Sequence, residues 1–146
     1  MAAERAPEPS LGYLLSDVVR LMKRDFYARA TGLGLTPALA KLLFHVHRSP
    51  GSHQTTLAQR LDVTPVTLCR MVDRLVARGF VRRQPDPADR RAVRVYVAAR
   101  GEPLVARMAR VADETGARAL KGVAAGELAE EAQQRRALAD NLGGET

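Results

Sequence analysis

The chain of 146 residues has one cysteine, no tryptophan and only 4% aromatic residues. A single cysteine excludes a disulfide framework within the chain and suits a reducing compartment. No apolar run approaches the ~18 residues of a membrane span, and the N-terminal segment MAAERAPEPS lacks the apolar region of a signal peptide. We therefore expect a soluble, cytoplasmic protein that does not contact a membrane.

The motifs of common enzyme and metal sites are also missing. Neither the Gly-x-Gly-x-x-Gly fingerprint nor Gly-Lys-Ser/Thr occurs, and the acidic residues are scattered along the chain. His45 and His47 are two residues apart on a predicted helix, so they point to different sides and make a poor ligand pair. The sequence predicts no enzyme activity, no cofactor and no metal site.

The positive charge is concentrated in one segment. Residues 60–100 hold ten arginines and four aspartates, which gives +6 of the chain's net +7. The remaining residues are almost neutral. Such a concentration is typical of a surface that binds a polyanion.

Apolar periodicity and capping residues predict a mainly α fold. Helices are expected over 11–30, from Thr36-Pro37 to about Ser49, and over 54–61, 64–78, 99–121 and 127–142. Alternation over 80–84 and 93–97 predicts a small β-hairpin, with a turn that contains Pro85, Asp86 and Pro87. We interpret residues 1–10 as a flexible arm and 11–146 as one domain. Within that domain, 36–97 form a winged helix-turn-helix, and 11–34 and 99–146 are expected to be dimerisation helices.

The predicted helix 64–78 has two distinct faces. At 100° per residue, one face holds Thr67, Arg70, Met71, Arg74 and Arg78, and the other holds Leu68, Val72, Leu75 and Val76. A short helix and a turn precede it, and its first turn offers free amides to a phosphate. In this geometry the first turn and Arg70 reach base edges in the major groove. The alternative is a surface helix with a solvated basic face.

The hairpin predicts a second contact. An arginine at its tip, in the stretch Asp89-Arg90-Arg91, can enter the minor groove, and Asp89 could orient the Arg91 guanidinium. The strand residues Arg82, Arg83 and Arg94 are expected to touch backbone phosphates or solvent. The simpler alternative is a turn with stray charges. The expected DNA-binding residues are Thr64, Pro65, Val66, Thr67, Arg70, Arg74, Asp89, Arg90 and Arg91.

This segment resembles the MarR family of bacterial transcription regulators. The matching positions are Leu57-Ala58, Leu61, Val63, Thr67, Arg70, Val72-Asp73-Arg74-Leu75, Gly79, Val81, Arg83, Asp86-Pro87 and Asp89-Arg90-Arg91-Ala92. Leu11-Gly12, Val19-Arg20, Leu35-Thr36, His47 and Glu102-Pro103-Leu104 further resemble its SlyA-like branch. The resemblance implies a homodimer with interlocking terminal helices and two winged units that read a pseudo-palindrome. It also implies major-groove contact by Arg70 and minor-groove contact by Arg91.

The same resemblance implies a control input. Many such regulators bind small phenolic or aromatic carboxylate ligands in a cleft between the dimerisation helices and the DNA-reading unit. In this chain the cleft would lie near Arg20, Arg24, Lys41, His45 and His47, where a cation can receive a carboxylate. Each of these residues could equally be an ordinary surface charge.

The leading hypothesis is a sequence-specific regulator of transcription, most often a repressor in such families, that a ligand releases from double-stranded DNA. An architectural or weakly specific DNA-binding protein without a ligand input is the alternative, and a winged helix used only for protein contacts fits the arginine-rich hairpin less well. Cys69 is interpreted as a small buried residue rather than a redox switch.

Overall fold

The computed structural model describes residues 10–143 of the chain. The elements, in chain order, are α1 (Leu11–Arg29), a short 3-10 helix η1 (Ala30–Leu33), α2 (Pro37–Arg48), β1 (Ser52–His53), α3 (Gln54–Leu61), α4 (Pro65–Ala77), β2 (Val81–Pro85), β3 (Val93–Val97), α5 (Glu102–Ala119) and α6 (Ala125–Gly143). The predicted fold class, mainly α with a small β wing, is confirmed.

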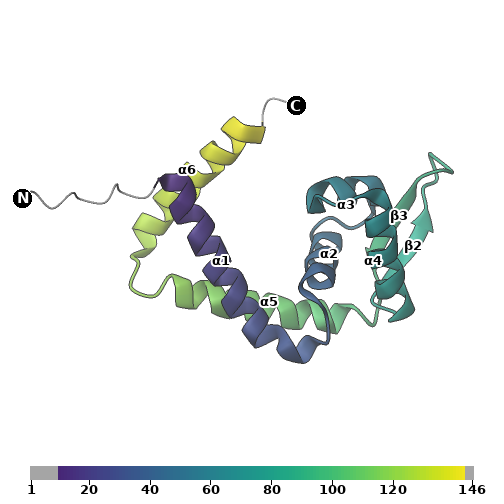
Figure 1. The fold of residues 1–146 in the computed structure, drawn as a ribbon, viewed down its shortest axis with the longest axis horizontal. Helices are drawn as coiled ribbons and strands as arrows, with labels where there is room; N and C mark the ends of the chain where they lie inside the picture. The colour runs from purple at the N-terminus through teal and green to yellow at the C-terminus, as the bar shows by residue number, and fades with distance from the viewer. Residues whose placement is uncertain (1–9, 144–146) are drawn as a thin grey trace, which may run out of the picture.

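The elements form two parts that share α5. Helices α1 and α5 pack against each other, and α6 follows α5 at the end of the molecule away from the sheet (Figure 1). At the other end of α5 lie α2, α3, α4 and the sheet, with the β2–β3 hairpin projecting from this unit (Figure 1). The chain enters the second part through η1 and leaves it through α5, so these two segments connect the terminal helices to the winged unit.

Local capping explains why the helices of the winged unit begin and end where they do. The hydroxyls of Thr36 and Thr64 accept hydrogen bonds from the amides of Leu39 and Thr67, and each threonine is followed by a proline in the first helical turn. Gly79 follows α4 with φ +72°, a conformation that glycine adopts at little cost and that ends the helix. These boundaries agree with the sequence prediction within one residue.

The sheet has three strands rather than the two of the predicted hairpin. Its order is β1–β3–β2 and all pairs are antiparallel, with Ser52 opposite Val95 and Arg83 opposite the same residue on the other side. β1 is only two residues long, so it has no alternation that a sequence pattern could reveal. Its pairing with β3 ties the connection between α2 and α3 to the base of the wing.

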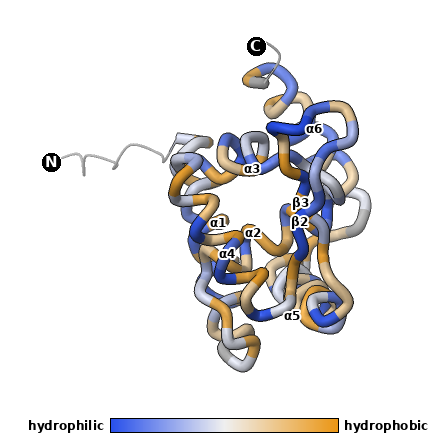
Figure 2. The backbone as a smooth tube through the Cα atoms, turned by 90° about the vertical axis from the view of Figure 1, so that its right-hand side faces the viewer, coloured by the Kyte–Doolittle hydropathy of each residue, from blue (hydrophilic) through white to orange (hydrophobic). Residues whose placement is uncertain are grey.

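The core lies inside the winged unit. Its most deeply buried side chains are aliphatic and come from α2, α3, α4 and β3: Leu42, Leu43, Val46, Leu57, Leu68, Val72, Leu75 and Val95. Viewed from this end, hydrophobic and hydrophilic stretches alternate along the backbone of the helices (Figure 2), as expected for elements with one buried face. In contrast, α1 has no fully buried residue.

Three boundaries differ from the prediction. Ser10 caps α1 by accepting the Tyr13 amide, so it is not part of a flexible arm; residues 1–9 lie outside the described residues. α5 begins at Glu102 instead of about residue 99, because Ala98 and Gly101 are held in a turn by backbone hydrogen bonds to Phe80 and to each other. α6 begins two residues earlier than expected, at Ala125.

Candidate nucleic-acid interface

Helix α4 divides into the two faces that its sequence predicted, with two exceptions. Leu68, Val72 and Leu75 are buried, while Thr67, Arg70 and Arg74 are exposed. Met71, expected on the arginine face, is half-buried against the core. Val76, expected inside, is 37% exposed, because its position on the helical wheel lies at the edge of the buried face.

Side-chain bonding separates the arginines of residues 60–100 into two groups. Five are held within the protein by hydrogen bonds or ion pairs: Arg60, Arg78, Arg82, Arg83 and Arg94. Among the residues that the structure describes, the guanidinium groups of the other five, Arg70, Arg74, Arg90, Arg91 and Arg100, make no hydrogen bond or ion pair and are exposed. Four of these five are arginines that the sequence assigned to DNA. They lie on α4 and at the wing tip.

Arg83, which was expected to touch backbone phosphate or solvent, is engaged within the protein and braces the wing against the helices. Its Nη1 lies 2.6 Å from Asp73 Oδ1, and its Nε donates to Gln54 Oε1 at 2.7 Å. Its Nη2 donates to the carbonyl of Cys69 at 3.2 Å. One guanidinium therefore joins β2 to both α3 and α4.

Asp86, which the sequence marked only as a turn residue, is buried where β2 passes into the wing tip and is 4% exposed. Its Oδ1 accepts the Ala88 amide at 2.9 Å, and its Oδ2 accepts Arg94 Nε at 2.8 Å. His53 Nε2 lies 2.5 Å from the same Oδ2. The Ala88 amide first, and then His53 and Arg94, hold the pKa of Asp86 well below its usual range. Arg94 is thus engaged within the protein and braces the wing as well.

This cluster predicts how stability responds to acid. Because the pKa of Asp86 is lower in the folded chain than in the unfolded chain, its stabilisation is present above the ordinary aspartate pKa of about 4 and is lost as the pH falls below it. We expect urea unfolding, followed by circular dichroism from pH 6 down to about 2, to show a smaller acid-induced loss of stability in Asp86→Asn than in the wild type. Asp89→Asn, an exposed aspartate of the same turn, should keep the wild-type slope. Equal slopes in all three proteins would contradict this assignment.

The wing tip has a different internal structure from the one expected. Asp89 Oδ1 accepts the backbone amide of Arg91 at 2.9 Å, and the Asp89 carbonyl accepts the Ala92 amide. Asp89 therefore shapes the turn and does not orient the Arg91 guanidinium. Arg90 and Arg91 are the two central residues of this turn, and both are exposed.

Cys69 corrects another interpretation. It is exposed on α4 and not a small buried residue. Its Sγ lies 3.7 Å from Arg83 Nη2. On the helical wheel it lies about 100° from Leu68 and about 120° from Leu75, outside the most deeply buried part of the helix, which accounts for the exposure.

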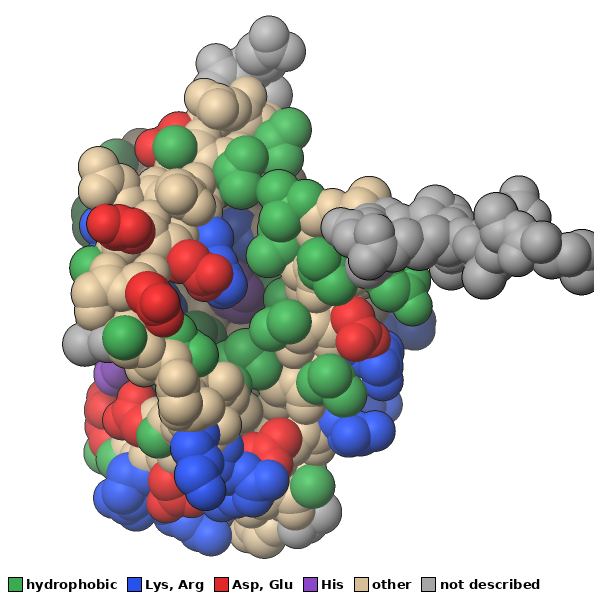
Figure 3. All heavy atoms as spheres, turned by 90° about the vertical axis from the view of Figure 1, so that its left-hand side faces the viewer, with side chains coloured by type: hydrophobic (Ala, Val, Ile, Leu, Met, Phe, Trp, Pro, Cys, Tyr) green, Lys and Arg blue, Asp and Glu red, His purple; other side chains and the backbone are tan. Residues whose placement is uncertain are grey.

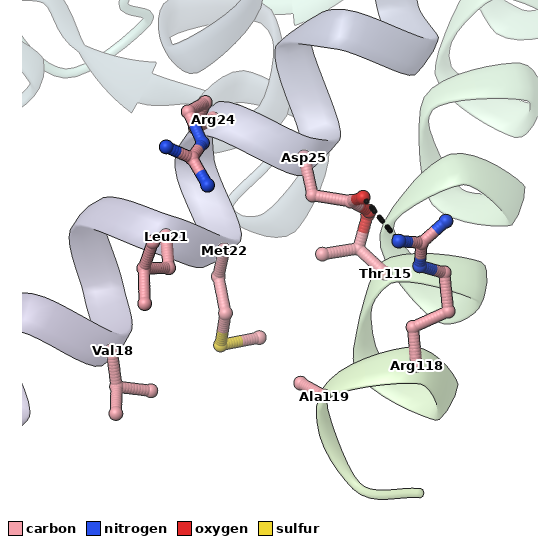
Figure 4. A pocket seen from close by; sticks show the side chains of 8 residues that line it. All are labelled: Val18, Leu21, Met22, Arg24, Asp25, Thr115, Arg118 and Ala119. Atoms are coloured by element: carbon pink, nitrogen blue, oxygen red, sulfur yellow. Dashed lines mark hydrogen bonds and ion pairs between the residues drawn. The ribbon is translucent and has the colours of Figure 1, made fainter.

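The residues expected to bind a ligand do not converge on one hollow. Arg24 lines a hollow of about 340 Å³ between α1 and α5. Its other lining residues are Val18, Leu21, Met22, Asp25, Thr115, Arg118 and Ala119 (Figure 4). Arg20 lies outside it and pairs with Asp17, and Lys41, His45 and His47 lie outside it on α2.

The chemistry of this hollow is amphipathic. Valine, leucine and methionine side chains of α1 lie on one side, and Arg118 of α5 lies 3.4 Å from Asp25 on the other (Figure 4). A hydrogen bond from the Thr115 hydroxyl is the main cause that lowers the pKa of Asp25, and Arg118 and Arg29 add to it. On α2, burial lowers the pKa of His45, which disfavours its cationic form. The cationic side chains that line the hollow are those of Arg24 and Arg118.

Within residues 10–143, no cluster of three or more histidine, cysteine, aspartate or glutamate side chains has the arrangement of a metal site. Over the same residues, none of the helices has both the length and the hydropathy to span a bilayer.

The fold and its exposed basic face define a winged helix-turn-helix protein. A sequence profile described as the MarR family matches residues 33–92. A crystal structure of MarR is similar over 96% of this chain and 95% of its own, with 27% identity and a TM-score of 0.80. A MarR-family transcriptional regulator from Silicibacter pomeroyi matches at 26% identity over 89% of this chain and 88% of its own, with a TM-score of 0.78. A mutant MarR from E. coli, complexed with operator DNA, matches at 26% identity over 88% and 92%, with a TM-score of 0.72.

Residues 33–92 thus match the MarR family of transcriptional regulators, and the chain has the fold of the MarR structures. The resemblance on which the sequence analysis relied is thereby confirmed at the level of the family.

Proposed function

We propose that this protein is a homodimeric, sequence-specific regulator of transcription that binds a pseudo-palindromic operator in double-stranded DNA and acts as a repressor. The observation that carries the proposal is that the guanidinium groups on α4 and the wing tip, of Arg70, Arg74, Arg90 and Arg91, are exposed and make no hydrogen bond or ion pair among the described residues. The neighbouring strand arginines, Arg82, Arg83 and Arg94, are bonded within the protein. A MarR that this chain resembles has been crystallised with operator DNA.

In the proposed complex, α4 lies in the major groove. Its first turn, Thr64 to Thr67, approaches the phosphate backbone and the edges of the bases, and Val66, which is 63% exposed, can contact a thymine methyl group. Arg70, one turn further along, reads guanine through its two-pronged donor set, and Arg74 follows on the same face. The wing places Arg90 and Arg91 in the adjoining minor groove.

Specific binding must be distinguished from the weakly specific, architectural alternative. The operator is first selected from random or genomic DNA, and its affinity is then measured against unrelated competitor DNA over a range of salt concentrations. A specific regulator is expected to bind its site about 10³-fold or more tighter than competitor. Equal affinity for both DNAs, with the same salt dependence, would favour the alternative.

The wing contact has its own prediction. Arg91→Ala is expected to weaken binding most at operators with A·T-rich flanks, because a narrow minor groove concentrates negative potential around an inserted arginine. We expect G·C-rich flanks to reduce the loss. Fluorescence anisotropy with the two flanking sequences measures the difference. The same loss at both flanks would show that Arg91 contributes only general charge.

Exposed apolar side chains support the homodimer. On α1, Leu11, Tyr13, Leu14, Val18, Val19, Leu21 and Met22 are each at least 36% exposed, as are Leu120, Val123, Leu138 and Leu142 towards the C-terminus. The face that carries α1 and α6 shows hydrophobic side chains gathered in its upper half beside a hollow (Figure 3). Two copies of one such patch can cover each other about a twofold axis.

Matched valine variants test the dimer. Val18→Glu is expected to shift the mass in solution from twice the chain's 15.9 kDa towards a single chain, since it puts a charge into the proposed apolar contact. Val66→Glu introduces the same change on α4, outside that contact, and should leave the mass unchanged. Light scattering after size-exclusion chromatography measures the mass of both variants. A wild-type protein of 15.9 kDa at working concentration would refute the homodimer.

A small aromatic carboxylate is the proposed releasing ligand. Two guanidinium groups, of Arg24 and Arg118, and an apolar wall line the hollow between α1 and α5, and this combination suits an anionic aromatic molecule. Titration with benzoate is expected to raise thermal stability and weaken operator binding, and Arg24→Ala should reduce both responses. If benzoate and related acids change neither quantity, the regulator has no such input.

A further inference from the structure

His53 lies where the wing meets the helix-turn-helix. It is the second residue of β1 and the residue immediately before α3. Its Nε2 lies 2.5 Å from Oδ2 of the buried Asp86, which is 33 positions further along the chain. Because a carboxylate can only accept, the imidazole N–H is the donor in this bond. The contact joins the start of α3 to the first residue beyond β2.

The backbone around His53 is held closely in place. β1 pairs with β3 through Ser52 and His53, and the Gly51 amide donates to the Val95 carbonyl at 3.0 Å. A Cβ on Gly51 would lie only 2.8 Å from the Tyr96 hydroxyl, so the two segments are already in close contact. The imidazole is therefore carried by a backbone that has little freedom to move away from Asp86.

The wing tip, in contrast, has few ties to the rest of the protein. Pairing between β2 and β3 ends at Pro85 opposite Val93. Beyond it, a backbone hydrogen bond joins Asp86 to Ala92, and two further bonds, to side chains within the turn, run from the Ala88 amide to Asp86 and from the Arg91 amide to Asp89. Among the described residues, the hydrogen bonds that tie residues 86–92 to groups outside the turn are those of the Asp86 carboxylate with His53 and Arg94. A two-stranded ribbon without further support has only marginal stability and is free to swing. The Asp86 carboxylate is the point at which the tip is fastened.

We infer that His53 is a positioning residue for DNA binding: by holding Asp86, it fixes the direction of the wing relative to α4, so that Arg90 and Arg91 are already placed for the minor groove. This inference rests on the proposed function. Its physical basis is that holding a binding loop in its bound orientation lowers the entropy cost of association. Arg94 shares Asp86 Oδ2, but it belongs to the wing itself, whereas His53 belongs to the helix-turn-helix.

A double-mutant cycle tests this role on the full-length protein and its selected operator. His53→Ala is expected to weaken binding about three- to tenfold. In a protein that already carries Arg90→Ala and Arg91→Ala, the same substitution should have almost no effect, because the groups that it positions are gone. Combined with Arg70→Ala, it should act additively, because Arg70 does not act through the wing. His53→Gln, whose side-chain amide can still donate to Asp86, should restore much of the affinity.

His47→Ala removes an exposed histidine of α2 and serves as the matched control. Circular dichroism and thermal unfolding of each variant verify that the fold is kept. The inference is overturned if His53→Ala binds as the wild type does, or if its effect is as large in the Arg90/Arg91 variant as in the wild type. A general loss of structure would reduce binding in every background, including that variant. Failure of the wild type to bind any operator specifically would instead refute the proposed function.

Discussion

Arg70→Ala is expected to weaken operator binding by about tenfold to a hundredfold per half-site and to relax the preference at one base position. Arg70 is exposed on α4, six residues beyond the cap at Thr64, and its guanidinium has no partner among the described residues of the protein. A bidentate contact from arginine to guanine contributes about 1–3 kcal/mol of discrimination, and a twofold dimer would lose it twice. Anisotropy measurements on operators mutated one base pair at a time give both quantities.

Arg110→Ala provides the charge-matched control for this experiment. Arg110 is exposed on α5, outside the helix-turn-helix and the wing. The Arg110→Ala variant should bind every operator sequence almost as tightly as the wild type, since it removes the same charge from an element outside the proposed DNA contact. If Arg70→Ala kept the wild-type base preference and lost affinity equally on all sequences, Arg70 would be a phosphate contact and the proposed docking of α4 would be wrong.

Gly101→Ala is expected to destabilise the fold by about 2–3 kcal/mol or more. Its backbone angles suit any residue, so the cost is purely steric. A Cβ at this position would lie 2.2 Å from the carbonyl oxygen of Phe80. That oxygen also accepts the Ala98 amide at 2.9 Å, so the backbone cannot withdraw without breaking this bond. Urea unfolding measures the change.

Gly116→Ala is the opposite case on the same helix. Nothing lies within 4 Å of a Cβ built there, and Gly116 is inside α5. Alanine should therefore stabilise the helix by roughly 0.5–1 kcal/mol through its better helix propensity. A loss of stability at residue 116 as large as that at residue 101 would mean that the close approach at Phe80 is not the cause.

The helices of the winged unit were predictable because their signals are local. Thr36-Pro37 and Thr64-Pro65 cap and start helices by themselves, and Gly79 ends one. β1 was missed because two residues carry no periodicity, and its partner strand lies more than 40 positions away. The start of α5 was misplaced because a long-range hydrogen bond, from Ala98 to Phe80, holds the preceding turn.

The candidate site likewise has features that local sequence patterns predicted and features that depend on long-range contacts. The helical wheel correctly predicted that Thr67, Arg70 and Arg74 are exposed, because α4 packs on the core through its apolar face. It could not tell which arginines are free, since the partners of Arg83 and Arg94 come from other elements. The role of Asp86 was hidden for that reason: one of its three donors, His53, is reached only when the sheet forms.

The direct passage from β3 into α5 has a mechanical consequence. α5 has 18 residues, which at about 1.5 Å per residue make a rod of roughly 27 Å. One end packs with α1, and the other carries the wing and its neighbours (Figure 1). A tilt of about 10° at the α1 end would displace the far end by about 5 Å, more than the rise of about 3.4 Å between successive base pairs. A small change in the angle between the terminal helices is therefore enough to move α4 and the wing out of register with the DNA grooves that they are proposed to contact.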